Sequence, residues 1–283
     1  MALNFLNRNN NSNNAEMSFI DHIEALRGHL FRALLAVLVG SVIAYWKMDF
    51  FFDQIIMGPA HKEFITYRWL CETSHALHMG NAMCLEDINI KLISTEMSSQ
   101  FLMSFTIAFV IGFVLAFPFI FWEFWRFVKP ALTEKEVSKT RGVVFWVSLL
   151  FFLGIAFGYY LMAPYSVNFF AAYTLSPLIQ NTFMISDYID NIVSLVLGCG
   201  IVFQLPLVVY FLAKVGIVTP TFLRTYRKYA VVVILLIAAV ITPPDIVSMT
   251  IASLPLLLLY EISIWIAGRV VKEKKKKEAE EWG

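Results

Sequence analysis

Long, nearly continuous apolar segments constrain the fold of this chain more than any other feature. Of its residues, 59% are hydrophobic and 15% charged, and its mean hydropathy of +0.68 lies outside the usual range of soluble domains. Most segments are near the ~20 residues that a helix needs to cross ~30 Å of hydrocarbon. They do not alternate residue by residue, so we expect helices and not a β-barrel. The six predicted spans are 29–46, 100–125, 142–162, 188–213, 228–241 and 247–267.

The distribution of lysine and arginine predicts which helix ends face the cytoplasm. Eighteen of the 22 basic residues lie before the first span or near its start, in or next to the second and fourth loops, or in the tail, and the other four lie in the first loop. Short cytoplasmic loops carry the positive excess, so both termini are expected to be cytoplasmic. We therefore predict one all-α, polytopic membrane domain over residues 1–283. Its parts are a cytoplasmic N-terminal segment (1–28), a long exported loop (47–98), a cytoplasmic loop (126–141) and a cytoplasmic tail (268–283).

The exported loop contains two of the three cysteines. Cys71 and Cys84 lie 13 positions apart, with His75 and His78 between them. In an oxidising exterior a disulfide is the favoured interpretation, and it would contribute ~3 kcal/mol by closing the loop. A zinc site is an alternative, although the spacing is unlike common zinc modules, and unpaired thiols are another. No metal site is assigned.

Two polar side chains interrupt the predicted spans. Gln204 lies in "GIVFQLP" of the fourth span, and Glu261 lies in "LLLLYEISIW" of the sixth. A charge at the bilayer centre costs ~2.5–3.5 kcal/mol, so such groups often line a transport pathway. An interhelical hydrogen bond is an equally good interpretation for Gln204. For Glu261 we favour a position near an interface or a pairing with a neighbouring helix.

No enzyme motif, nucleotide-binding loop or cofactor site is visible in the sequence, so no enzymatic activity and no cofactor are predicted. The expected cytoplasmic face instead combines carboxylates with a basic excess, and the carboxylates are Asp21, Glu24, Glu134 and Glu136. Exposed glutamates are usually just solvated. A cluster of them could still receive an arginine-bearing partner, because carboxylate and guanidinium form bidentate hydrogen bonds. Phe127 could offer an aromatic face to the same group.

Several blocks of sequence together resemble the TatC family, the multispanning receptor subunits of the twin-arginine protein translocase. They are "DHIEALRGHL", "GPA" with Pro59, "FWRFVKPALTEKE", "FGYYLMAPYSVNFF", "VFQLP" with Gln204 and Pro206, and "ITPPDIVSMTIASLPLLLLYEISIW" with Asp245 and Glu261. The family's six helices and cytoplasmic termini agree with the loop charges. The resemblance implies partner-binding or structural roles at these five intramembrane or loop positions.

The resemblance also implies a function, which is to bind the paired-arginine signal peptides of folded precursor proteins. The implied partners are single-span subunits of the TatA and TatB type and further copies of the chain, with no role for nucleic acid. Export would be driven by the proton-motive force across a bacterial cytoplasmic (inner) membrane. The implied signal-binding residues are Glu24, Arg27, Phe127, Pro130, Leu132, Glu134 and Glu136.

Three departures from the family pattern affect these expectations. Ala25 stands where a glutamate often precedes the Leu-Arg pair, so Glu24 is rotated by ~100° on a helix. Gln204 replaces a glutamate and cannot titrate, and Met249 replaces a glutamine. A small-solute transporter lined by Gln204 and Glu261 is the main alternative. Such transporters often contain internal repeats, and none is visible in this sequence. A membrane scaffold is the third alternative.

Overall fold

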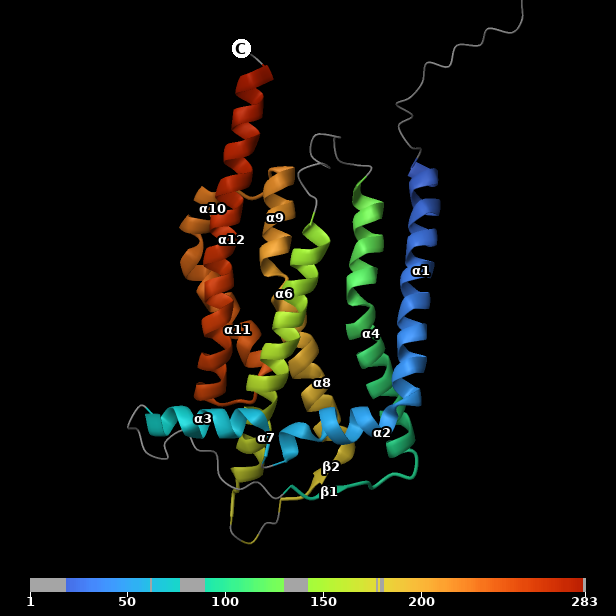
Figure 1. Cartoon of the computed structure of the whole chain (residues 1–283). Helices are drawn as coiled ribbons and strands as arrows, with labels where there is room; N and C mark the ends of the chain where they lie inside the picture. The colour runs from blue at the N-terminus through green and yellow to red at the C-terminus, as the bar shows by residue number, and fades with distance from the viewer. Residues whose placement is uncertain are drawn as a thin grey trace, which may run out of the picture.

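The computed structural model describes residues 19–61, 63–76, 90–129, 142–176, 178 and 181–281, which form a bundle of long helices (Figure 1). Within these residues, five helical segments are long and apolar enough to cross a membrane. They comprise α1 (Phe19–Trp46), α4 (Ser99–Val128), α6 (Val143–Phe157) continued by η4 (Gly158–Met162) and α7 (Ala163–Ala172), α8 (Ile185–Val202) with α9 (Leu205–Val215), and α12 (Ile246–Glu281). The prediction of an all-α polytopic membrane fold is therefore confirmed.

The predicted fifth span corresponds to α11 (Arg227–Ile241), which has only 15 residues. It follows the short α10 (Pro220–Thr225), and Tyr226 separates the two helices. At 1.5 Å per residue α11 is ~22 Å long, which is less than the ~30 Å of a hydrocarbon core. Five spans are therefore long helices, and the count of six stays a prediction.

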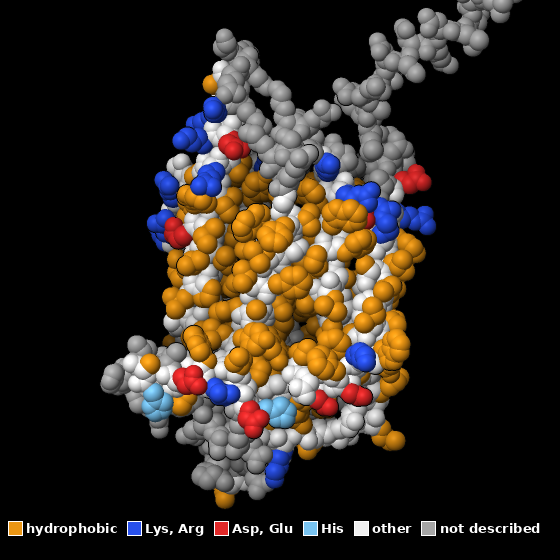
Figure 2. Space-filling view, in the orientation of Figure 1, with side chains coloured by type: hydrophobic (Ala, Val, Ile, Leu, Met, Phe, Trp, Pro, Cys, Tyr) orange, Lys and Arg blue, Asp and Glu red, His pale blue; other side chains and the backbone are white. Residues whose placement is uncertain are grey.

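Both described chain ends lie at the same end of the bundle, which we call the terminal end; the other is the distal end (Figure 1). The space-filling view shows hydrophobic side chains over the middle of one face and charged side chains toward both ends (Figure 2). This banding is the pattern expected of a protein that spans a bilayer, because charged groups avoid hydrocarbon.

Helix α1 packs mainly against α4, and the two helices approach closely where both carry small residues. A Cβ atom added to Gly112 of α4 would lie 2.4 Å from the backbone N of Ser41 on α1, and one added to Gly40 would lie 3.0 Å from the Gly112 carbonyl oxygen. Small residues permit such close packing in membranes, where no hydrophobic effect drives helices together. Much of the rest of α1 is exposed, including Leu34, Leu38 and Val42.

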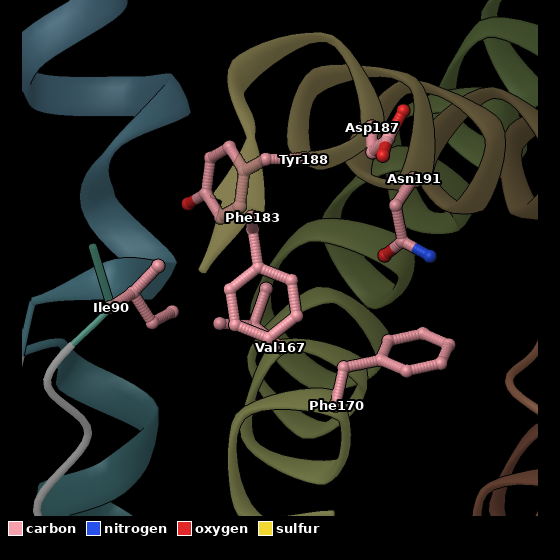
Figure 3. A pocket seen from close by; sticks show the side chains of 7 residues that line it. All are labelled: Ile90, Val167, Phe170, Phe183, Asp187, Tyr188 and Asn191. Atoms are coloured by element: carbon pink, nitrogen blue, oxygen red, sulfur yellow. The ribbon is translucent and has the colours of Figure 1, made fainter. Parts of the chain in front are cut away.

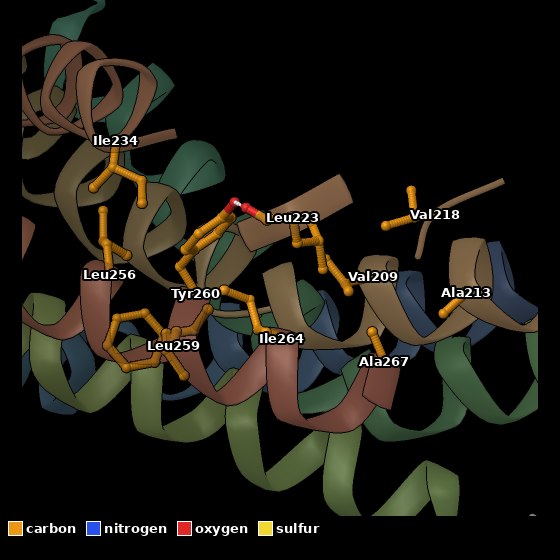
Figure 4. Packing of buried hydrophobic residues seen from close by; sticks show 11 residues of the cluster. Val209, Ala213, Val218, Leu223, Ile234, Leu256, Leu259, Tyr260, Ile264 and Ala267 are labelled. Atoms are coloured by element: carbon orange, nitrogen blue, oxygen red, sulfur yellow. Dashed lines mark hydrogen bonds between the residues drawn. The ribbon is translucent and has the colours of Figure 1, made fainter. Parts of the chain in front are cut away.

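The C-terminal half has its own apolar core, formed between α9, α10, α11 and α12 (Figure 4). Ile234 of α11 and Leu256 of α12 are among its buried members. Within this core the hydroxyl of Tyr260 donates to the Leu223 carbonyl oxygen over 2.8 Å. Such a hydrogen bond satisfies a polar group that would be costly to bury alone. The core thus fixes the short α10 and α11 against the long α12.

Short elements cap the distal end. They are α2 (Met48–Phe50), the π-helix η1 (Phe51–Ile56), the 3-10 helix η2 (Gly58–Ala60), α3 (Ile65–Ala76) and the parallel two-residue strands β1 (Leu92–Ile93) and β2 (Phe183–Met184). Tyrosine hydroxyls fasten this cap to the bundle: Tyr159 donates to Ile55 O over 2.8 Å and Tyr188 donates to Ile56 O over 2.8 Å. They supply hydrogen bonds to carbonyl groups of η1.

Cys71 on α3 is disulfide-bonded, and Cys199 on α8 is free and buried. Cys84 lies outside the described residues, so the pairing of Cys71 with Cys84 stays a prediction. Among the residues that the structure describes, no three His, Cys, Asp or Glu side chains form a group that could hold a metal ion.

Candidate functional site

A buried carboxylate is the central feature of the terminal end. Glu123 lies in the last two turns of α4 and is only 1% exposed. Its charge is compensated by side chains from both α1 and α4. On α1, His29 and Arg32 are three residues apart, and on α4, Arg126 follows Glu123 by three, so each pair lies on one helix face.

Three side chains contact the carboxylate of Glu123. Nδ1 of His29 lies 2.6 Å from Oε2 of Glu123, and Nε of Arg32 donates to the same oxygen over 3.1 Å. Nη1 of Arg126 donates to Oε1 over 3.4 Å. Arg32 and Arg126 are about half exposed, so their guanidinium groups remain partly solvated while the carboxylate is enclosed. We call these four residues the Glu123 cluster.

The imidazole of His29 connects this cluster to a predicted binding residue. Nδ1 of His29 also lies 3.0 Å from Nη2 of Arg32. The nitrogen cannot both accept from Arg32 and donate to Glu123, and the shorter contact to a carboxylate favours donation to Glu123. The His29 ring then packs edge-on to Phe127, with ring centroids 6.1 Å apart. Glu123 therefore orients a ring that contacts Phe127.

The charge balance of the cluster limits what it can bind. One carboxylate faces two guanidinium groups, so the cluster has an excess of positive charge even when His29 is neutral. Another arginine would be repelled here. Carboxylates that receive an arginine-bearing ligand would have to come from elsewhere on the terminal end.

The structure describes three of the seven predicted signal-binding residues. Glu24 and Arg27 are exposed on the first turns of α1, and Phe127 is half-buried at the end of α4. Glu24 and Phe127 therefore lie on two helices that the Glu123 cluster joins at the terminal end. Four other predicted residues fall outside the described residues: Pro130, Leu132, Glu134 and Glu136.

Gln204 lies where the fourth span is broken. Helix α8 ends at Val202 and α9 begins at Leu205, with Pro206 buried in its first turn. Nε2 of Gln204 donates to the Val147 carbonyl oxygen over 3.3 Å, while its buried Oε1 has no hydrogen-bond partner among the residues that the structure describes. The interhelical hydrogen bond that sequence offered as one interpretation is present.

The remaining predicted positions have structural partners. Glu261 forms a bidentate ion pair with Arg227, in which Nε lies 2.8 Å from Oε1 and Nη2 lies 2.9 Å from Oε2. Asp245 caps α12, because Oδ1 accepts from the backbone N of Val247 over 2.8 Å. The buried Pro59 accepts from the hydroxyl of Tyr67 over 2.6 Å. These contacts account for Glu261, Asp245 and Pro59 without a ligand.

The distal end contains a mainly apolar cavity of about 240 Å³ (Figure 3). Phe170 and Val167 of α7 and Phe183 of β2 line it, with Asp187 and Asn191 of α8 on one wall. Oδ1 of Asn191 already accepts from Oγ of Ser166 over 2.9 Å. The described residues of its lining offer neither a nucleophile paired with a base nor a cluster of metal ligands.

Sequence reasoning missed Glu123, although a signal was present. It lies inside the predicted span 100–125, in "FWEFW", where a carboxylate is as costly as Glu261 in the sixth span. The same rule applied to Glu123 would have predicted a buried ion pair. Its partners on α1, 91 and 94 positions away, could not be read from the sequence.

Comparison with known proteins gives a consistent result. A family model described as "Sec-independent protein translocase protein (TatC)" matches residues 21–255. The chain is similar to the protein of that name from Blattabacterium sp. subsp. Periplaneta americana (strain BPLAN), with 37% identity over 260 residues, 92% of this chain and 98% of that protein. It is also similar to TatCy of Bacillus subtilis (strain 168), with 33% identity over 265 residues, 93% of this chain and 94% of that protein.

A solved structure has the same overall fold. The crystal structure of a twin arginine translocase receptor, TatC, in DDM superposes with a TM-score of 0.67. Its sequence is 30% identical, and the match covers 87% of this chain and 99% of that chain. The likeness therefore extends over most of the chain.

Proposed function

Because the chain belongs to the TatC family of Sec-independent protein translocase proteins, we propose that it is a receptor for the twin-arginine signal peptides of folded precursors. As a family member it is a multi-pass membrane protein of twin-arginine translocation and not an enzyme. The binding face proposed here is the terminal end, on the cytoplasmic side.

One observation carries the proposal: the Glu123 cluster joins α1 to α4 at the terminal end. The junction holds two predicted signal contacts, Glu24 on α1 and Phe127 on α4, on neighbouring helices. Residues 130–141 follow directly after α4. Glu24 and Phe127, which come from two distant stretches of sequence, thereby lie on helices that are joined at one end of the molecule.

The chemistry of the face favours arginine. Glu123 is already neutralised, so the proposed acceptors are Glu24, Glu134 and Glu136. A guanidinium group can form two parallel hydrogen bonds with a carboxylate and can stack on an aromatic ring such as Phe127, whereas lysine is a point charge. This difference explains how such a receptor would prefer Arg-Arg over Lys-Lys.

The wider assembly is proposed on the same basis. Single-span subunits of the TatA and TatB type would pack on exposed apolar flanks of the bundle, together with further copies of this chain. The proton-motive force across the bacterial cytoplasmic membrane would drive export. A small-solute transporter is less well supported, because Glu261 is half exposed and its carboxylate is already paired with Arg227.

Site-specific photocrosslinking tests the receptor proposal. A photoreactive amino acid at Glu136 or Phe127 should crosslink to an Arg-Arg signal peptide and much less to its Lys-Lys version. The matched control is the same probe at Tyr173, which is exposed at the distal end. Equal crosslinking of both peptides, or none in a correctly inserted protein, would refute the proposal.

Substitutions give an independent test. Glu136→Ala and Phe127→Ala should each lower signal-peptide affinity without removing the protein from the membrane. Glu24→Gln should weaken binding less than Glu136→Gln, because Ala25 indicates a rearranged contact on α1. A larger loss at Glu24 would instead make α1 the principal acceptor.

A further inference from the structure

Helix α3 lies across the bundle at the distal end, at a steep angle to the spanning helices (Figure 1). It has 12 residues, and part of it projects beyond the neighbouring helices. In a bilayer whose normal follows the spanning helices, α3 would run close to the plane of the membrane. It lies near the level at which charged side chains replace the apolar belt (Figure 2).

One side of α3 is attached to the protein. Thr66, Tyr67 and Ser74 are buried. Oγ1 of Thr66 donates to the Tyr160 carbonyl oxygen, and the hydroxyl of Tyr67 donates to Pro59 O over 2.6 Å. This attachment fixes the rotation of the helix about its own axis, so its other sides have defined directions.

The two other sides of α3 differ in character. At about 100° per residue, Ile65 and Trp69 are separated by about 40° around the helix axis, and Arg68 and His75 by about 20°. Ile65 is 65% exposed and Trp69 is 58% exposed, which makes one outward side apolar. Arg68 and His75 are exposed on another side, which is polar. Protein, apolar and polar sides follow one another around α3.

We propose that α3 is an interfacial helix that inserts Ile65 and Trp69 into the lipid at the distal membrane surface. At the membrane surface, the three sides of α3 would face the rest of the protein, the lipid and the water, respectively. Tryptophan is enriched at that depth, and amphipathic helices bury their apolar side ~5–10 Å into the headgroup boundary. The apolar side of α3 would continue the lipid-facing belt of the bundle.

Lipid is a better occupant of this side than a second protein. A stable protein interface buries about 1,200–2,000 Å² in total, and two large side chains on a 12-residue helix offer far less. The charged neighbours also fit a headgroup region, where long basic side chains such as Arg68 reach toward water and phosphate. The disulfide at Cys71 on the same helix restrains the segment that would sit on the lipid.

Lipid photocrosslinking in nanodiscs tests this inference. A diazirine-bearing amino acid replaces Trp69 in one variant of the full chain and Arg68, its neighbour on the polar side, in another. Leu38, exposed on α1, provides a lipid-facing reference. We expect lipid adducts at position 69 that approach those at position 38 and exceed those at position 68 several-fold.

Two results would overturn the inference. One is a yield of lipid adducts at position 69 no higher than at position 68 while position 38 reacts strongly. The other is crosslinking from position 69 predominantly to a second copy of the chain, which would make this side a protein interface. Repeating the measurement with the probe at Ile65 guards against a local effect of replacing tryptophan.

Discussion

Glu123 illustrates how one residue can define a junction between helices. A carboxylate that is 1% exposed loses most of its hydration, and the loss is offset only if cationic donors replace the water. His29 and Arg32 provide such donors from α1, so the register of α1 against α4 is tied to one side chain. In the proposed receptor, this register sets where Glu24 lies relative to Phe127.

We predict that Glu123→Gln destabilises the protein by about 1.5–3 kcal/mol, the value of hydrogen bonds to a charged group. Glutamine keeps the shape but removes the charge that holds Arg32 and His29. Thermal unfolding in detergent measures the loss, and Asp187→Asn, at an exposed carboxylate of α8, is the control. An unchanged unfolding midpoint would mean that the cluster contributes nothing to the junction.

Tyr67 supports a prediction of pH dependence. Burial raises the pKa of Tyr67, so the folded protein favours the neutral phenol. A group whose pKa is higher in the folded state contributes fully below the unfolded pKa, about 10 for tyrosine, and loses that contribution as pH rises toward the folded value. We therefore expect the unfolding midpoint to fall above pH 10, by less in Tyr67→Phe than in the unsubstituted protein.

The same variant should also be less stable at neutral pH. Removing the hydroxyl leaves Pro59 O without its 2.6 Å donor, at a cost of about 1–3 kcal/mol. Tyr173→Phe, at a side chain that is 61% exposed, is the matched control for both measurements. Equal pH profiles for Tyr67→Phe and the unsubstituted protein would contradict the assignment.

At the scale of elements, α1 and α4 depend on the close contact between Gly112 and Ser41. We predict that Gly112→Ala destabilises the protein by about 1–3 kcal/mol, because the new methyl group would overlap backbone atoms of Ser41 that cannot rotate away. Gly28→Ala on α1 is the control: its nearest neighbour would be Nη1 of Arg32 at 3.7 Å, so the substitution should be neutral or stabilising. Unfolding midpoints of both variants in detergent test the pair.

The elements that could be predicted from the sequence are the helices whose bounds follow the long apolar segments. The predicted span 100–125 lies within α4, and the first span ends at residue 46 in both prediction and structure. The predicted span 142–162 ended too early, because the helix continues through η4 and Pro164 to Ala172. Proline is tolerated in the first turn of a helix, so Pro164 does not end the segment.

Other features depend on tertiary contacts that hydropathy does not encode. The break in the fourth span at Gln204 is local, since Pro206 lacks a backbone N–H and lies in the first turn of α9. In contrast, the pairing of β1 with β2 and the attachment of η1 by Tyr159 and Tyr188 join segments about 90 to 130 positions apart. For the candidate site, the sequence was enough to propose Glu24 and Phe127 as signal contacts. It did not predict that Glu123 joins the two helices that carry them.

At the scale of the whole molecule, the two ends are chemically unequal. Both described chain ends lie at the terminal end, which requires an even number of crossings, and the short α11 would supply the sixth (Figure 1). Eighteen of the 22 basic residues belong to segments predicted on that side. The positive-inside tendency therefore predicts that the terminal end is cytoplasmic.

Cysteine accessibility in intact cells tests this orientation. Glu96→Cys places a thiol at an exposed distal position and Lys275→Cys places one near the end of α12. Of the described native cysteines, Cys199 is buried and Cys71 is disulfide-bonded, so neither should compete for a membrane-impermeant maleimide. We expect labelling of Glu96→Cys in intact cells and of Lys275→Cys only after permeabilisation. The reverse pattern would place the proposed arginine-binding face on the exported side, where it could not meet precursors before their export.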